Sequence, residues 1–118
     1  MIAVIFELIP KSTRAADYFQ LAEELRPLLD DIDGFLSIER FESLTEPGKY
    51  LSLSFWENEQ SVAEWRNTQN HRGAQTEGRR SIFEDYRLRV AHVLRDYGLT
   101  DRLEAPQDSR NAHDSDSF

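Results

Sequence analysis

The stretch of residues 50–71 changes its hydrophobic period once, and this change constrains the fold more than any other feature of the sequence. In residues 50–56 the large apolar side chains occupy every second position, which is the period of a β-strand. After this strand the apolar positions recur every three or four residues, and Asn58 is a suitable N-cap for a helix that carries Trp65. A strand therefore leads into a helix that presents an indole to a sheet.

Composition limits the kinds of protein that this chain can be. Its 118 residues, 39% of them hydrophobic, have room for one domain with a modest core. The formal net charge of −8 argues against a nucleic-acid partner, because phosphate binding depends on lysine and arginine. No apolar run is long enough to span a bilayer, the N-terminus lacks the features of a signal peptide, and cysteine is absent. We expect a cytoplasmic protein with neither a nucleic-acid nor a membrane partner.

Three further stretches have the pattern of strands. Residues 2–9 are almost entirely apolar, which is typical of a central strand covered on both faces. Residues 35–42 alternate, and a turn with Pro-Gly chemistry at 45–48 predicts that they form a hairpin with the strand at 50–56. Alternation from Phe83 predicts a long last strand that ends at Gly98. The polar residues 71–80 are expected to form a loop or helical fragments.

A second helix is predicted between the first two strands, with an apolar stripe over residues 18–32. Ser12 or Thr13 can cap its N-terminus. Pro27 lies inside the pattern, and a proline lacks the N–H that a helix interior uses. We therefore expect a break or kink near Arg26 and two shorter helical pieces.

The order strand, helix, strand, strand, helix, strand predicts an α+β fold over residues 1–98. It is the split βαβ arrangement of the ferredoxin-like fold, a four-stranded antiparallel sheet with helices on one face. The other face keeps apolar side chains that a monomer would expose, so we expect a homodimer that packs sheet on sheet. Residues 99–118 are polar with a net charge of −3, from five acidic residues and two arginines. We expect this tail to be mobile unless a partner subunit holds it.

Few side chains offer obvious chemistry. Trp65 is either core packing or the wall of an aromatic pocket. His71 is either an acid or base near neutral pH or a surface histidine at a helix end. Neither His92 nor His113 has a partner at metal-ligand spacing, so no metal site is predicted. Arginines 79, 80, 87 and 89 form either a solvated basic face or, at the mouth of a pocket, a site for a carboxylate or phenolate.

Several short motifs together resemble the antibiotic biosynthesis monooxygenase superfamily. They are Asp33-Gly34-Phe35-Leu36, Ser54-Phe55-Trp56 followed by Trp65, Asn70-His71-Arg72, and the stretch from Tyr86 to Gly98. The resemblance covers residues 1 to about 98. It implies a dimeric α/β barrel with a cavity between the helices and the sheet of each subunit.

The resemblance also implies an activity. The superfamily includes cofactor-independent oxygenases of polycyclic phenols and quinol-like molecules, in which the deprotonated substrate gives its electron to oxygen directly. We therefore predict a monooxygenase that needs no cofactor and acts on a small aromatic or quinol-type substrate. The resemblance assigns catalytic roles to Trp65 and His71. It assigns substrate binding to Phe55, Asn67, Asn70 and Arg79.

Two alternatives stay open. One is a haem-binding or haem-degrading protein that uses His71. The haem-degrading branch has an asparagine in its first strand and a histidine about ten residues after the helix tryptophan. Here the first strand has Phe6 and Glu7, and the residue ten positions after Trp65 is Gln75. The other alternative is a non-catalytic dimeric ligand-binding module.

Overall fold

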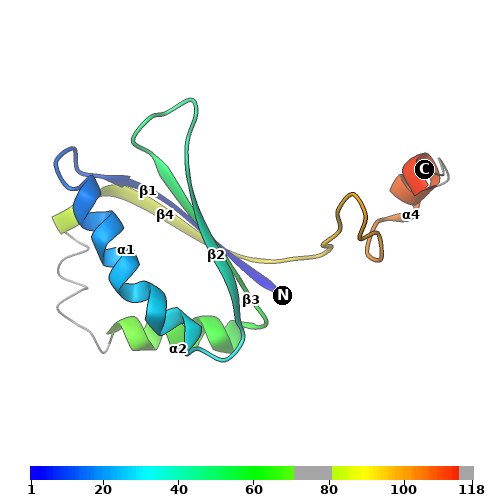
Figure 1. Ribbon diagram of the computed structural model, residues 1–118, viewed down its shortest axis with the longest axis horizontal. Helices are drawn as coiled ribbons and strands as arrows, with labels where there is room; N and C mark the ends of the chain where they lie inside the picture. Colours follow the sequence, from blue (N-terminus) through cyan, green and yellow to red (C-terminus); the bar gives the residue numbers. More distant parts are fainter. Residues whose placement is uncertain (71–80, 115–118) are drawn as a thin grey trace.

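A computed structural model describes residues 1–70 and 81–114, and its main body is a four-stranded antiparallel sheet with helices against one face (Figure 1). The strands are β1 (Ile2–Pro10), β2 (Phe35–Glu42), β3 (Tyr50–Trp56) and β4 (Phe83–His92), in the order β2-β3-β1-β4. Helix α1 (Ala15–Asp30) follows β1, and helix α2 (Glu59–Asn70) follows β3. The predicted α+β fold of the ferredoxin-like type is confirmed. Residues 71–80, predicted as a loop or helical fragments, lie outside the described residues.

The alternation within β3 decides which side chains face the helices. Ser52, Ser54 and Trp56 are buried on the helix side, and the large apolar residues between them point to the other face of the sheet. In the register of the sheet, Ser52 lies opposite Arg40 of β2 and Phe6 of β1. β3 therefore contributes two small side chains, Ser52 and Ser54, to the helix-facing side of the sheet.

The start of β2 is fixed by Gly34, which has a φ of +91°. Its carbonyl accepts a hydrogen bond of 2.8 Å from the backbone N–H of Glu57. A β-bulge follows, because the register shifts between Phe35 and Ser37. This shift lets Phe35 and Ile38, which are three residues apart, pack against the same core cluster.

No helix among the described residues is long and apolar enough to cross a membrane.

Two clusters of buried side chains hold the helices on the sheet. The first cluster lies under the end of α1, and the second lies near its start. They consist of Ile2, Leu29, Ile32 and Trp56, and of Leu8, Tyr18 and Ile82.

The expected break near Arg26 is wrong, because α1 runs without interruption through Pro27. Leu25 and Leu29 are both buried, so tertiary packing on either side of the proline holds the helix together. Only three residues of α1 follow Pro27, which keeps the disturbed turn at the end of the helix. The expected side-chain caps at residues 12 and 13 are also wrong. The N-cap is Arg14, whose side chain pairs with Asp17 in the first turn.

The last strand is shorter than predicted. β4 ends at His92, opposite Ile2 at the beginning of β1. The ladder closes with one more hydrogen bond, from Val93 N–H to Met1 O at 3.0 Å. Beyond this hydrogen bond none of the described strands lies beside β4, so the alternation up to Gly98 does not extend the ladder.

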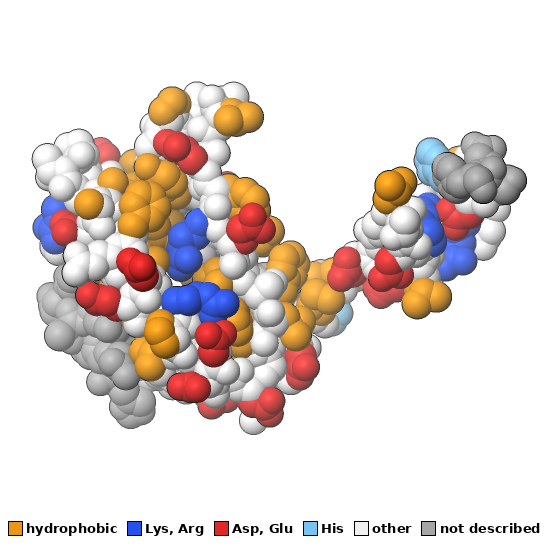
Figure 2. Space-filling view, viewed as in Figure 1, with side chains coloured by type: hydrophobic (Ala, Val, Ile, Leu, Met, Phe, Trp, Pro, Cys, Tyr) orange, Lys and Arg blue, Asp and Glu red, His pale blue; other side chains and the backbone are white. Residues whose placement is uncertain are grey.

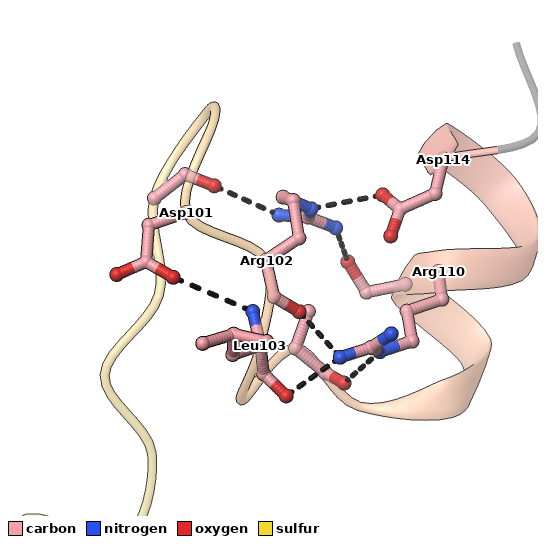
Figure 3. Close-up of polar contacts among 8 residues, drawn as sticks. Asp101, Arg102, Leu103, Arg110 and Asp114 are labelled. Atoms are coloured by element: carbon pink, nitrogen blue, oxygen red, sulfur yellow. Dashed lines mark hydrogen bonds and ion pairs between the residues drawn. The ribbon is translucent and has the colours of Figure 1, made fainter. Parts of the chain in front are cut away.

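The described part of the tail, residues 99–114, projects away from the sheet (Figure 1). It contains the helical turns α4 (Gln107–Ser109) and η1 (Arg110–Asp114), and two arginines organise it (Figure 3). Arg102 donates hydrogen bonds to Gly98 O, Ser109 Oγ and Asp114 Oδ1. Arg110 donates to the carbonyl oxygens of Arg102, Leu103 and Ala105. That residues 99–118 are mobile or held by a partner subunit stays a prediction.

Candidate functional site

A cavity of about 690 Å³ lies between α1, α2 and the helix-facing side of the sheet. This volume is in the range of small-molecule sites. Most of its wall is apolar, and Figure 2 shows hydrophobic side chains around a hollow that also holds Lys or Arg atoms. The apolar wall comes from both layers: Val4, Phe6, Ile38, Phe83, Leu88 and Val90 from the sheet side, and Leu21, Leu25, Leu29 and Val62 from the helices.

Two serines of β3 form part of the floor of the cavity. Ser54 accepts a hydrogen bond of 2.9 Å from the indole N–H of Trp56, which is only 2% exposed, so this buried donor is satisfied. Ser52 is 7% exposed, and its hydroxyl makes no hydrogen bond with the described residues. Ser52 is thus a buried donor and acceptor directed at the cavity.

Trp65 serves both of the roles that the sequence left open. It packs against the core cluster that contains Trp56, and it also lines the cavity. Its indole N–H has no hydrogen-bond acceptor among the described residues. An indole in this position can donate to an oxygen atom of a bound molecule.

Arg40 and Tyr18 form a polar pair on the cavity wall that sequence reasoning missed. The Nε of Arg40 donates a hydrogen bond of 3.1 Å to Tyr18 Oη, and its guanidinium carbon lies 6.0 Å from the centre of the tyrosine ring. Tyr18 is 5% exposed. A tyrosine within an apolar helix stripe is a signal in itself, because its hydroxyl needs a partner when buried. Naming Arg40 as that partner requires knowing how α1 packs over β2.

Two predicted substrate-binding residues lie away from the cavity. Phe55 is on the opposite face of β3 from Ser54 and Trp56, because neighbouring side chains of a strand alternate. Asn67 is exposed on the outer side of α2, beside Glu64 and Thr68 in a shallow surface depression. Neither residue lines the cavity, so substrate contacts there are not available to them.

The remaining predicted residues are at the end of α2 and beyond it. Asn70 is the last residue of α2, and its side chain is not among those described. His71 and Arg79 lie outside the described residues. In the part of the chain that is described, no group of three or more histidine and acidic side chains is arranged to hold a metal ion.

Arg87 and Arg89 of the predicted basic cluster do not line the cavity, and Arg80 lies outside the described residues. Arg89 forms an ion pair of 3.0 Å with Glu7, its neighbour across β1 and β4. Arg87 lies opposite Glu7 in the same register. The pairing with the adjacent acids at 84 and 85 that the sequence suggested does not occur among the described ion pairs.

Comparisons with known proteins give a consistent result. The family described as Antibiotic biosynthesis monooxygenase matches residues 1–77. A protein of Pyricularia oryzae named Jasmonate monooxygenase ABM is 48% identical over 93 residues, which cover 79% of this chain and 43% of that protein. The chain thus spans less than half of this relative. The uncharacterized protein YqjZ of Bacillus subtilis is 33% identical over 93 residues, 79% of each chain.

Solved structures support the fold alone. The structure of Rv0793 from Mycobacterium tuberculosis superposes with a TM-score of 0.70 at 15% identity. The match covers 82% of this chain and 98% of that one.

Proposed function

Because this chain belongs to the antibiotic biosynthesis monooxygenase family, we propose that it is a cofactor-independent monooxygenase of a small aromatic or quinol-type substrate. The observation that carries the proposal is the apolar cavity of about 690 Å³ with Trp65 in its wall, whose indole N–H has no acceptor among the described residues. A flat ring fits such a wall, and the indole N–H is available to an oxygen atom of the ring system. Trp65 is therefore proposed to orient the substrate and to stabilise its anion.

The chemistry requires a substrate that supplies its own electrons. A methylene group activated by neighbouring rings loses a proton, and the resulting anion gives one electron to O₂. Recombination of the two radicals forms a C–O bond, and the hydroperoxide then loses water, so that CH₂ and O₂ become C=O and H₂O. The protein has to bind the ring, assist loss of the proton and hold the anion. We propose His71 for the proton transfer.

Oxygen uptake on anthrone, which has a methylene between two rings, tests this proposal. Trp65→Phe keeps an aromatic ring but removes the N–H, and we expect a rate loss of about a hundredfold, as for one donor to a developing oxyanion. His71→Ala is expected to lower the rate as well. Asn67→Ala is the matched control, since this exposed side chain lies outside the cavity. Wild-type turnover in both the Trp65 and the His71 variants contradicts the assigned roles.

A second candidate substrate is a jasmonate-type acid, favoured by the 48% identity to the protein named for that activity. Hydroxylation of a C–H bond by O₂ forms an alcohol and water and consumes two electrons and two protons that the substrate does not provide. The test is therefore incubation with jasmonate in the presence and absence of NADPH, with mass spectrometry of the product. A product heavier by one oxygen atom only with the reductant supports this candidate over the first.

We further propose that the protein is a homodimer through the outer face of the sheet. Leu51, Leu53 and Phe55 of β3 lie on this face with Ile5 of β1, and Phe41 at its edge is 44% exposed. An apolar surface of this kind favours a partner, and a second copy offers the matching face. Light scattering is expected to give twice the mass of 13.8 kDa, and Leu53→Lys to halve it. A wild-type monomer at micromolar concentration contradicts the proposal.

A further inference from the structure

We infer that Arg40, Ser52 and Tyr18 form a carboxylate-binding subsite in the cavity, and that the substrate is a monocarboxylic acid with an apolar body. The inference rests on the proposed function, because it identifies one end of the molecule that the same cavity would hold. Its evidence is separate from the family: the three residues line one cavity, Arg40 is bonded to Tyr18 and lies opposite Ser52 in the sheet, and none of the three is engaged by a carboxylate of the described residues.

Arg40 is the cation of this subsite. Only its Nε is used, in the bond to Tyr18, so both terminal nitrogens are without partners among the described residues. The protein carries a net charge of −8, and four other arginines form ion pairs with nearby acids. The acid two positions further along β2, Glu42, accepts a hydrogen bond from Gly48 N–H instead. Arg66 of α2 also lines the cavity without an ion pair among the described residues, but Arg40 is the arginine held in place on the wall by Tyr18. An arginine held in this way on an apolar wall, with no described acid beside it, is suited to an anionic ligand.

Ser52 and Tyr18 supply the other two donors. Ser52 lies opposite Arg40 in the β2–β3 register, and such cross-strand pairs have Cβ atoms about 4.5–5.5 Å apart. One carboxylate can therefore reach both side chains. Tyr18 Oη accepts from Arg40, which leaves its own proton to donate. Both residues are more than nine-tenths buried. The Ser52 hydroxyl has no partner among the described residues, and such a buried hydroxyl destabilises a protein unless a ligand satisfies it.

The shape and charge of the subsite favour a carboxylate. The guanidinium fork matches two oxygen atoms in one plane, whereas a phenolate offers a single oxygen. The acidic residues that also line the cavity, Glu84 and Asp85, are at the β4 edge of the sheet, and Arg40 is at the β2 edge. Three strand spacings, roughly 14 Å, separate these edges. Repulsion across that distance is weak compared with direct contact to Arg40.

Calorimetric titration with 2-naphthoate and 2-naphthamide tests the inference, because the two probes share a ring and differ in charge. The wild-type protein is expected to bind the carboxylate at least about tenfold more tightly than the amide, from the usual strength of charged hydrogen bonds. Arg40→Gln is expected to abolish this preference, and Ser52→Ala to reduce it several-fold. Arg26→Gln is the matched control, since it removes the same charge from the surface of α1, outside the cavity.

Equal binding of the two probes to the wild-type protein, or a preference that survives in Arg40→Gln, overturns the inference. Tighter binding of 2-naphthol than of 2-naphthoate overturns it too, because it would make the subsite a phenolate site. If Arg40→Gln does not fold, the inference is still tested by the preference of the wild-type protein for 2-naphthoate over 2-naphthamide and by the reduction of that preference in Ser52→Ala. Oxygen uptake is measured separately: turnover without carboxylate preference refutes only the subsite, and preference without turnover refutes only the monooxygenase.

Discussion

A methyl group added at Gly34 should destabilise this protein far more than one added at Gly48. Both glycines have nearly the same positive φ, +91° and +90°. A Cβ atom at Gly34 would lie 2.1 Å from Ser61 Oγ and 3.1 Å from Ser61 Cβ, whereas one at Gly48 would have no atom within 4 Å. The pair therefore separates the conformational cost from the cost of the contact.

The magnitude follows from three contributions. An alanine at positive φ costs about 1–2 kcal/mol, and this applies to both positions. Overlap in a packed site adds about 1–3 kcal/mol at Gly34 alone. Ser61 cannot turn away freely, because it is 4% exposed and its hydroxyl donates to Asn58 Oδ1 at 3.0 Å; losing that bond costs about 1 kcal/mol. If Ser61 moves to relieve the overlap it loses its hydrogen bond, so these two costs do not add in full. We expect Gly34→Ala to lower the free energy of unfolding by about 2 kcal/mol more than Gly48→Ala does.

Urea unfolding followed by tryptophan fluorescence measures this difference, since Trp56 and Trp65 are both at the helix–sheet contact. The double variant Gly34→Ala/Ser61→Ala should recover part of the loss, because the Oγ atom at 2.1 Å is then absent. Equal losses in Gly34→Ala and Gly48→Ala would refute the reasoning. So would a Gly34→Ala loss that is unchanged in the Ser61→Ala background.

Three further predictions concern a helix cap, the tail and the alternative ligand. Asn58→Ala should lower the free energy of unfolding by about 1 kcal/mol, because Asn58 Oδ1 caps the backbone N–H of Ser61, while Asn58→Asp should keep the cap; equal losses contradict this. Arg102→Gln should speed proteolysis within residues 99–114 without changing the main unfolding transition, and a shifted transition would mean that the tail stabilises the domain. Titration with haemin should give no saturable Soret shift, and a shift that disappears in His71→Ala would favour the haem-binding alternative.

Elements that depend on neighbouring residues in the chain could be predicted from the sequence. The switch from strand to helix after β3 can be predicted from the spacing of the apolar residues alone. The cap can be predicted because Asn58 accepts a hydrogen bond from a backbone N–H only three residues later in the chain. Features that depend on residues far away in the chain could not be predicted from the sequence. The end of β4 at His92 is set by where β1 begins, and the continuity of α1 through Pro27 is set by burial on the sheet.

The residues of the candidate site also differ in whether the sequence alone can place them. Trp65 could be found because a tryptophan in a helix stripe faces the sheet in any register. The sequence does not say which face of β3 the helices cover, so it cannot show that Phe55 lies on the face away from the cavity. Arg40 and Ser52 cannot be found from the sequence for a related reason: they are twelve positions apart in the chain, and only the pairing of β2 with β3 makes them neighbours.

The alternation in β3 links the cavity to the proposed dimer. Small side chains at Ser52 and Ser54 leave space under the helices, and the large ones between them are placed on the outer face. A shift of the strand by one residue would fill the cavity with Leu53 and put serines on the outer face. Such a shift would thus remove the cavity and the apolar outer surface together. The proposed ligand site and the proposed subunit surface would therefore be two consequences of one sequence pattern, and selection on either one would constrain the other.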